Sequence, residues 1–252
     1  MENVMDENDR WGAVGEYFNF RLHMLGSDVT LIKTDENGYP SLNIDEKFYT
    51  AADRVCTIMS GNNYLLAEEY LDRYGDPWTD VLRKNFRAGN SLFYVGGIEQ
   101  LLIFRDLDTD IGLLPMMKYE EAQSDYLHSF NSYWSSAIFI PKNSSTTDFT
   151  GYILEAMQAD SYCSTSVAYY DVVLQGRAMR DKDSCEMLDI IRQSRTIDPE
   201  FAYNFLGIDN VYQTALKDKS TGQFASKMKS MQKMAEKNID RFIKNYSSDS
   251  EE

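Results

Sequence analysis

Three short and almost uninterrupted apolar runs limit the folds open to this chain. They are residues 91–95, 111–115 and 137–141. Runs of this length predict strands that are buried on both faces of a parallel or mixed sheet, because such strands have no solvent-facing positions. Helical patterns lie around and between the runs. An alternation of buried strands with helices predicts an α/β architecture.

Helical periodicity accounts for most of the remaining chain. Residues 9–25 begin with Asp9 as a predicted N-cap, and an Asn37-Gly38 turn predicts a short β-hairpin, since glycine adopts positive φ cheaply. The second half of the chain is almost wholly helical in pattern. The predicted helices cover 9–25, 45–60, 77–88, 147–159, 164–175, 183–194, 209–217 and 222–246. The helix over 183–194 begins with the capping box Asp183-x-x-Glu186.

Charge and composition exclude several classes of protein. The 252 residues include 25 basic and 40 acidic side chains, which gives a net charge of −15. This charge repels nucleic acid and anionic lipid, so neither is an expected partner. No apolar segment reaches the ~20 residues that span a bilayer, and Met1–Glu7 has neither the basic patch nor the apolar core of an export signal. Taken alone, these features predict a soluble, unexported globular chain.

Residues that carry catalytic or metal chemistry are scarce. His23 and His128 are the two histidines, and neither lies in a metal-binding or hydrolase motif, so structural or solvated roles are favoured. The three cysteines lack C-x-x-C spacing, which favours buried free thiols, while a Cys163–Cys185 bridge stays open. No phosphate-binding glycine loop is present. The sequence therefore predicts no catalytic residue, no metal site and no cofactor.

Aromatic side chains beside amides form the more informative pattern. Flat rings offer apolar faces to C–H groups, and neighbouring amides serve hydroxyl groups, so such pairs suit a carbohydrate or another polar organic ligand. Packing in the core explains any single pair at least as well. The segments concerned are Tyr17-Phe18 with Asn19 and Phe20, Tyr133-Trp134 near Asn131, Tyr169-Tyr170, and Tyr203 and Phe205 around Asn204.

Read in order, several segments resemble the extracellular solute-binding proteins of ABC importers, especially the carbohydrate-type members related to maltodextrin-binding proteins. The resemblance lies in the order and spacing of the segments and covers most of the chain. It corresponds to the C-terminal two-thirds of a typical member. The segments are Glu16–Phe20 with the following Lys33–Tyr39 hairpin, Phe86–Gly97, Asp110–Pro115 and Ser136–Lys142.

The resemblance implies a fold and a division of the chain. The fold would be an α/β lobe of the type II periplasmic-binding-protein kind, helix-rich with a short mixed sheet, and incomplete as a second lobe. Residues 1–130 would begin the second lobe, 131–170 would be a crossover strand and helices that normally belong to the first lobe, and 171–252 would supply the terminal helices of the second lobe. Most of the first lobe and the export signal with its lipobox cysteine lack counterparts here. A separately encoded or upstream first lobe is therefore an expected partner, because hinge closure of two lobes clamps the ligand in such folds.

The resemblance also implies a non-enzymatic function. The chain would bind a solute, an oligosaccharide above all, and present it to an ABC transporter permease as a bacterial lipoprotein on the extracellular face of the cell membrane. Ile98 stands where maltodextrin binders carry tryptophan, which argues against a maltodextrin ligand. The expected ligand-binding residues are Tyr17, Asn19, Gly96, Gly97, Tyr133, Trp134, Tyr203 and Phe205.

An alternative from a different class remains open. The chain would be a degenerate or truncated family member that acts as a protein-interaction module through the surface left bare by the missing lobe. An exposed apolar patch is expected in that case. The sequence identifies neither the solute nor the oligomeric state.

Overall fold

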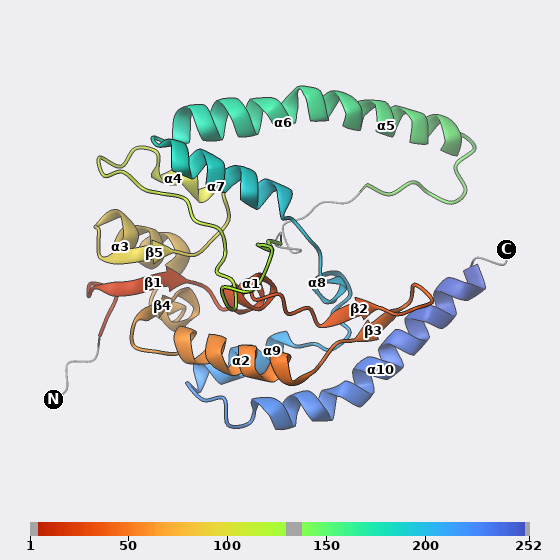
Figure 1. The fold of residues 1–252 in the computed structure, drawn as a ribbon, viewed down its shortest axis with the longest axis horizontal. Helices are drawn as coiled ribbons and strands as arrows, with labels where there is room; N and C mark the ends of the chain where they lie inside the picture. The colour runs from red at the N-terminus through yellow and green to blue at the C-terminus, as the bar shows by residue number, and fades with distance from the viewer. Residues whose placement is uncertain (1–4, 130–137, 250–252) are drawn as a thin grey trace. The chain divides into compact units, whose positions relative to one another are not determined.

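The computed structural model describes residues 5–129 and 138–249, and the chain divides into two compact units. Unit 1 comprises residues 1–96, 115–130 and 191–252, and unit 2 comprises 97–114 and 131–190. The fold is mixed α/β, about 52% helical with a small sheet, as the sequence predicts (Figure 1). No helix among the described residues is both long and apolar enough to cross a membrane.

A three-stranded parallel sheet forms the centre of unit 1. Its strands are β1 (Trp11–Gly15), β4 (Tyr64–Leu66) and β5 (Ser91–Tyr94), in the order β4-β1-β5. Gly15 pairs with Leu66, and Val14 pairs with Tyr94. The predicted helix over 9–25 is therefore wrong in its first half, and α1 covers only Asn19–Gly26. The 11–15 segment is extended because it has a hydrogen-bonding strand on each side, which a local pattern does not reveal.

None of the three apolar runs forms a strand that is buried on both faces. The first forms β5, but on the edge of the sheet, with Leu92 and Phe93 exposed. The second, 111–115, forms no strand, and within it the Leu113 N–H donates to Ser184 Oγ at 2.9 Å. In the third, residue 137 lies outside the described residues and 138–141 form no strand, with Ile138 and Phe139 exposed. The prediction of strands buried on both faces is wrong for all three runs, because apolar character does not supply a pairing partner.

The predicted hairpin is confirmed. Strands β2 (Ile32–Thr34) and β3 (Pro40–Leu42) pair antiparallel. Asp35 Oδ1 accepts hydrogen bonds from the N–H groups of Asn37 and Tyr39, both at 2.8 Å, and Gly38 has φ +84°. Figure 1 shows the hairpin beside helix α10 (Phe224–Asp249), against which β3 packs.

The other predicted helices of unit 1 are present. Helix α2 (Glu46–Met59) is capped by Asp45, whose side chain accepts from the Phe48 N–H. The predicted helix over 77–88 is a π-helical segment, η2 (Trp78–Arg83), followed by α3 (Lys84–Arg87). It ends at Gly89 with φ +71°. The other elements are η1 (Ala67–Tyr70), α8 (Pro199–Tyr203) and α9 (Asp209–Lys217).

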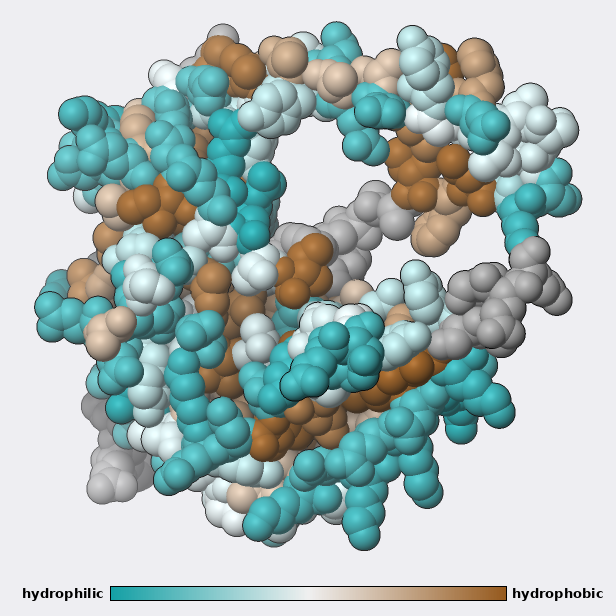
Figure 2. Space-filling view, turned by 45° about the vertical axis from the view of Figure 1, so that its right-hand side comes forward, coloured by the Kyte–Doolittle hydropathy of each residue, from teal (hydrophilic) through white to brown (hydrophobic). Residues whose placement is uncertain are grey.

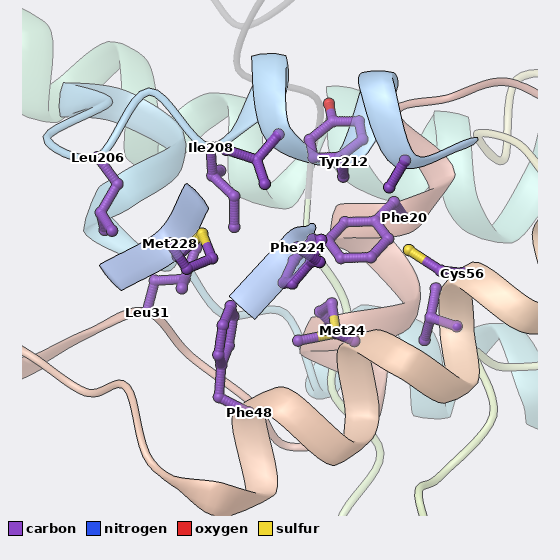
Figure 3. Packing of buried hydrophobic residues seen from close by; sticks show 14 of the residues in the cluster. Phe20, Met24, Leu31, Phe48, Cys56, Leu206, Ile208, Tyr212, Phe224 and Met228 are labelled. Carbon is purple, nitrogen blue, oxygen red and sulfur yellow. The ribbon is translucent and has the colours of Figure 1, made fainter. Parts of the chain in front are cut away.

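Two hydrophobic clusters cover the two faces of the parallel sheet. Tyr64 and Leu66 of β4 belong to the larger cluster, and Leu65 between them belongs to the smaller one. This division follows from the alternation of side chains along a strand. The larger cluster gathers α1, α2, α9 and α10, and in it the rings of Phe20 and Tyr212 stack at 4.7 Å (Figure 3). The two clusters thus cover β1 and β4 on both faces, while the edge strand β5 keeps Leu92 and Phe93 exposed.

Unit 2 is built from helices. These are α4 (Gln100–Phe104), α5 (Thr147–Cys163), α6 (Thr165–Val167), the π-helical η4 (Ala168–Ala178) and most of α7 (Lys182–Gln193). Its small core includes Leu101, Leu174 and Leu188. The predicted capping box at Asp183 is wrong, because the cap lies two residues earlier in the chain. Asp181 Oδ1 accepts the Ser184 N–H at 2.7 Å and so caps α7.

Candidate functional site

The carboxyl ends of the three parallel strands meet at one edge of the sheet in unit 1. Glu16 and Tyr17 follow β1, Glu68 follows β4 by one residue, and Gly96 follows β5. The Val95 N–H donates to the Val14 carbonyl at 2.9 Å, so the segment after β5 runs along β1. Ligands of α/β proteins bind at this edge, because the loops that leave the strands converge there. We define Glu16, Tyr17, Asn19, Glu68, Trp78 and Gly96 as the sheet-edge cluster.

Asn19 fixes the turn that leaves β1. Its Oδ1 accepts the Glu16 N–H at 2.7 Å and the Tyr64 hydroxyl at 3.4 Å. A side chain on Gly15 would collide with Asn19 Oδ1 and with the Tyr64 hydroxyl, so this position requires glycine. Asn19 is fully buried, and its Nδ2 has no hydrogen-bond partner among the described residues. Both N–H donors of the Asn19 amide are therefore unused among the described residues.

Glu68 brings a carboxyl group of altered acidity to the cluster. Its Oε1 accepts the Tyr17 N–H at 2.9 Å, and its Oε2 is buried with no hydrogen-bond partner among the described residues. Burial raises the pKa of Glu68 to about 7; the Tyr17 N–H opposes this shift, and the charges of Glu16 and Glu69 add to it. Near neutral pH this carboxyl group is therefore partly protonated. The protonated form donates a hydrogen bond, and the ionised form only accepts.

Two rings flank these carboxyl groups. The Trp78 indole N–H donates to Glu16 Oε2 at 2.7 Å, which orients both half-buried side chains. Tyr17 lies in the larger hydrophobic cluster, where burial, followed by the charges of Glu69 and Glu68, raises its pKa to about 12. The hydroxyl of Tyr17 therefore stays neutral at physiological pH. The cluster combines acceptors, an amide donor and aromatic faces, and it holds no nucleophile beside a base.

The structure gathers some of the predicted ligand-binding residues and separates others. Tyr17, Asn19 and Gly96 share the sheet edge. Gly97 is the first residue of unit 2, where an added β-carbon would meet the Glu99 carboxylate. Tyr133 and Trp134 lie outside the described residues. The ligand roles of all these residues remain predictions.

Tyr203 and Phe205 belong to a different group of rings. Tyr203 is exposed and stacks on Phe205 at 5.3 Å, and Phe242 of α10 lies 4.8 Å from Tyr203. Phe205 is buried in the larger cluster. Asn204 between the two rings has φ +48°, and its left-handed backbone ends α8. The described contacts of Phe205 are those of a core residue.

Three members of the cluster, Glu16, Glu68 and Trp78, are absent from the set predicted as ligand residues. Glu16 stands inside the segment that carries the family resemblance, yet only its neighbours are in that set. Glu68 directly follows the apolar run Tyr64–Ala67. Such a run predicts a buried strand, so a carboxylate just after it is a signal by which Glu68 could be found from the sequence. Trp78 joins the cluster only through the fold, since 62 residues separate it from its partner Glu16.

A second polar cluster is enclosed in unit 1 and is structural. Arg21, which is 3% exposed, pairs with Asp209 at 2.9 Å and covers the ring of Phe201. Asp198 Oδ2 accepts the Leu31 N–H at 2.6 Å, and both carboxyl oxygens of Glu200 accept the Leu206 N–H. Burial raises the pKa of Glu200 to about 7, while Arg21 opposes that shift. These groups hold loops of the backbone in place.

Both histidines are buried in unit 1. His128 Nε2 accepts the Met116 N–H at 2.9 Å, which places the proton on Nδ1, where it faces Ser194 Oγ at 2.7 Å. Neither nitrogen of His23 has a hydrogen-bond partner among the described residues. Burial lowers the pKa of each to about 4, so both are neutral at pH 7. His128 is a structural residue, although not in the polar loop environment that its sequence suggests.

Neither the cysteines nor clustered metal ligands add a reactive group. All three cysteines are free; Cys56 is buried, Cys185 is half-buried and Cys163 is exposed. The prediction of buried thiols is therefore wrong for Cys163. Within residues 5–129 and 138–249 no group of three or more histidine, cysteine, aspartate or glutamate side chains could hold a metal ion.

Comparisons of the chain with protein-family models, with curated proteins and with solved structures found no match. The resemblance to solute-binding proteins thus stands on the sequence segments alone. The geometry of the sheet edge is an independent observation.

Proposed function

We propose that the chain captures a small polar solute, a carbohydrate in the first instance, at the sheet edge of unit 1. The fold would be a helix-rich lobe of the type II periplasmic-binding-protein kind. The protein would present its solute to the permease of an ABC importer on the extracellular face of a bacterial membrane. Binding would involve no covalent step.

The observation that carries this proposal is the convergence of Glu16, Tyr17, Asn19 and Glu68 at the carboxyl ends of β1 and β4. Carboxylates and amides at such an edge bind vicinal hydroxyl groups, because each offers two hydrogen-bonding atoms. Trp78 adds an aromatic surface whose edge is already fixed by Glu16. The unpartnered atoms of Asn19 and Glu68 are enclosed, so direct contacts to a solute would come from the half-buried side chains of Glu16 and Trp78.

Isothermal titration calorimetry of the full chain with a panel of oligosaccharides tests the proposal. We expect one sugar to release heat, and we expect Glu16→Gln to weaken its binding at least about tenfold, because the neutral amide is a weaker acceptor than a carboxylate. The matched control is Glu36→Gln, a glutamate exposed in the β2–β3 turn, which should leave the affinity unchanged.

Two results would contradict separate parts of the proposal. Heat from a peptide or a polyamine, but from no sugar, would reject the carbohydrate and keep a solute-binding role. Equal sugar affinity in the wild type and in Glu16→Gln would place the binding site elsewhere in the molecule.

A further inference from the structure

Helix α5 of unit 2 has an apolar face that nothing in the described chain covers. None of its residues is buried. Phe149 is 65% exposed, Tyr152 71% and Met157 61%, with Ile153 at 39%. Figure 2 shows hydrophobic side chains open at the surface in its upper part, where α5 lies.

The spacing of these side chains makes them one surface. Phe149, Ile153 and Met157 follow each other at four-residue steps, and Tyr152 stands three residues after Phe149, so all four lie on one side of the helix. We call them the α5 face. A large apolar side chain left mostly open to water is ordinary when it is alone, but a continuous group of them is typical of a binding surface.

The charges around the α5 face are all of one sign. Between Lys142 and Arg177 the chain has four acidic residues and no basic residue. Three of the acids, Asp148, Glu155 and Asp160, lie on α5 itself. On the helix, Asp148 and Glu155 border one side of the α5 face and Asp160 follows it one turn on, so the apolar surface has acidic neighbours.

We infer that the α5 face is the docking surface for another protein, whose contact patch is apolar and is bordered by lysine and arginine. Complementary charge at the border favours such a partner and disfavours the other occupants. A second copy of this chain would bring acidic helix against acidic helix, and the whole chain carries −15. Anionic lipid is repelled for the same reason.

This inference does not depend on sugar binding. The α5 face lies in unit 2, whereas the sheet-edge cluster lies in unit 1. If the protein bound no sugar, the docking surface on α5 would still stand. If the α5 face bound no partner, the sheet-edge cluster would still be the candidate sugar site.

A synthetic helical peptide with leucine along one side and lysine along both borders is the probe. Fluorescence anisotropy with the full chain should show binding of this basic peptide and much weaker binding of a matched peptide with glutamate in place of lysine. The triple variant Phe149→Ser, Ile153→Ser, Met157→Ser should lose at least about tenfold in affinity, as expected for the centre of an interface. Leu71→Ser, which changes an exposed leucine of unit 1, should have no effect.

A second variant tests the charges and keeps the experiment decisive if the triple variant folds poorly. Asp148→Asn, Glu155→Gln, Asp160→Asn should reduce binding of the basic peptide and abolish the difference between the two peptides. Equal binding of both peptides by the wild type, or no binding of either, would overturn the inference.

Two further measurements identify the competing occupants. Sedimentation that shows a dimer dispersed by the triple variant would replace the inference by self-association. Cosedimentation with phosphatidylglycerol vesicles that the triple variant abolishes would replace it by lipid binding.

Discussion

Unit 1 and unit 2 differ in how they treat their hydrophobic and charged side chains. Unit 1 has a sheet covered on both faces by two clusters, and it encloses an arginine, several carboxyl groups and two histidines with them. Unit 2 has one small cluster, and its longest helix buries no residue. Within the described chain, unit 1 therefore has the larger core, although Leu92 and Phe93 of β5 stay exposed, whereas unit 2 leaves the apolar side of α5 uncovered. The two binding surfaces that we propose therefore differ in kind: one is a polar sheet edge in unit 1, and the other is an apolar helix face in unit 2.

The largest expected effect is a difference in the free energy of unfolding between two variants, in which one phenylalanine of each unit is replaced by alanine. Phe48→Ala in α2 should lower the free energy of unfolding by about 3–5 kcal/mol, because Phe48 is fully buried and its removal leaves a cavity. Phe149→Ala in α5 should change it by no more than about 0.5 kcal/mol, since that ring is mostly exposed. Urea unfolding followed by circular dichroism measures both. A large loss in Phe149→Ala would mean that α5 is covered in solution.

The next test compares two arginines. Arg21→Met should cost about 3 kcal/mol, near the lower end for breaking a buried ion pair, because Asp209 keeps some exposure to water. Arg180 of unit 2 pairs with Asp110 at the surface, so Arg180→Met should cost less than about 1 kcal/mol. Thermal unfolding of both variants at pH 7 gives the difference. Similar losses would show that Arg21 is not enclosed as the structure has it.

A further effect depends on pH. The pKa of Glu68 is raised in the folded state from 4.5 to about 7, so the folded protein holds this proton more tightly than the unfolded chain does. Its contribution to stability is therefore full below pH 4.5 and is lost as the pH rises through 7. Glu68→Gln should be more stable than the wild type by about 3 kcal/mol at pH 8 and equal to it at pH 4, because the amide carries no charge. Urea unfolding at the two pH values measures the difference in stability between the two proteins. If this difference did not change with pH, the carboxyl group of Glu68 would not be buried.

The smallest expected effect has the opposite sign and lies in unit 2. Hydrogen bonds from the Ser184 side chain and N–H lower the pKa of Asp181 below 3.8. The stability that Asp181 adds is therefore present above pH 3.8 and is lost as the pH falls through the lowered pKa. Asp181→Asn should reduce the melting temperature slightly at pH 7 and not at all at acid pH. A change that grows as the pH falls would show that the cap at Ser184 is absent.

The sequence anticipates the candidate site in part. The family resemblance, together with the pairing of rings and amides, singles out Tyr17, Asn19 and Gly96, and the structure brings these three to one sheet edge. Glu68 and Trp78 are not predicted, because their relation to Glu16 depends on contacts across 50 residues or more. Phe205 illustrates the converse, since the sequence does not distinguish a ring that faces a ligand from one that fills the core.

Local patterns by themselves determined the hairpin and several helices with their ends. Asp45 caps α2, Gly89 ends α3, and the Asp35–Gly38 turn joins β2 to β3, because each of these features is decided within a few residues. The apolar stripe of 222–246 likewise fixed α10.

Only the tertiary structure decided which extended segments became strands and which charges were enclosed. Trp11–Gly15 is a strand because β4 and β5 satisfy its backbone on both sides. Segment 111–115 has no such partner among the described residues, and the Leu113 N–H donates to a serine hydroxyl instead. Backbone pairing and burial are properties of segments far apart in the chain, so the acidity of Glu68 and the exposure of the α5 face follow from the fold and not from residue type.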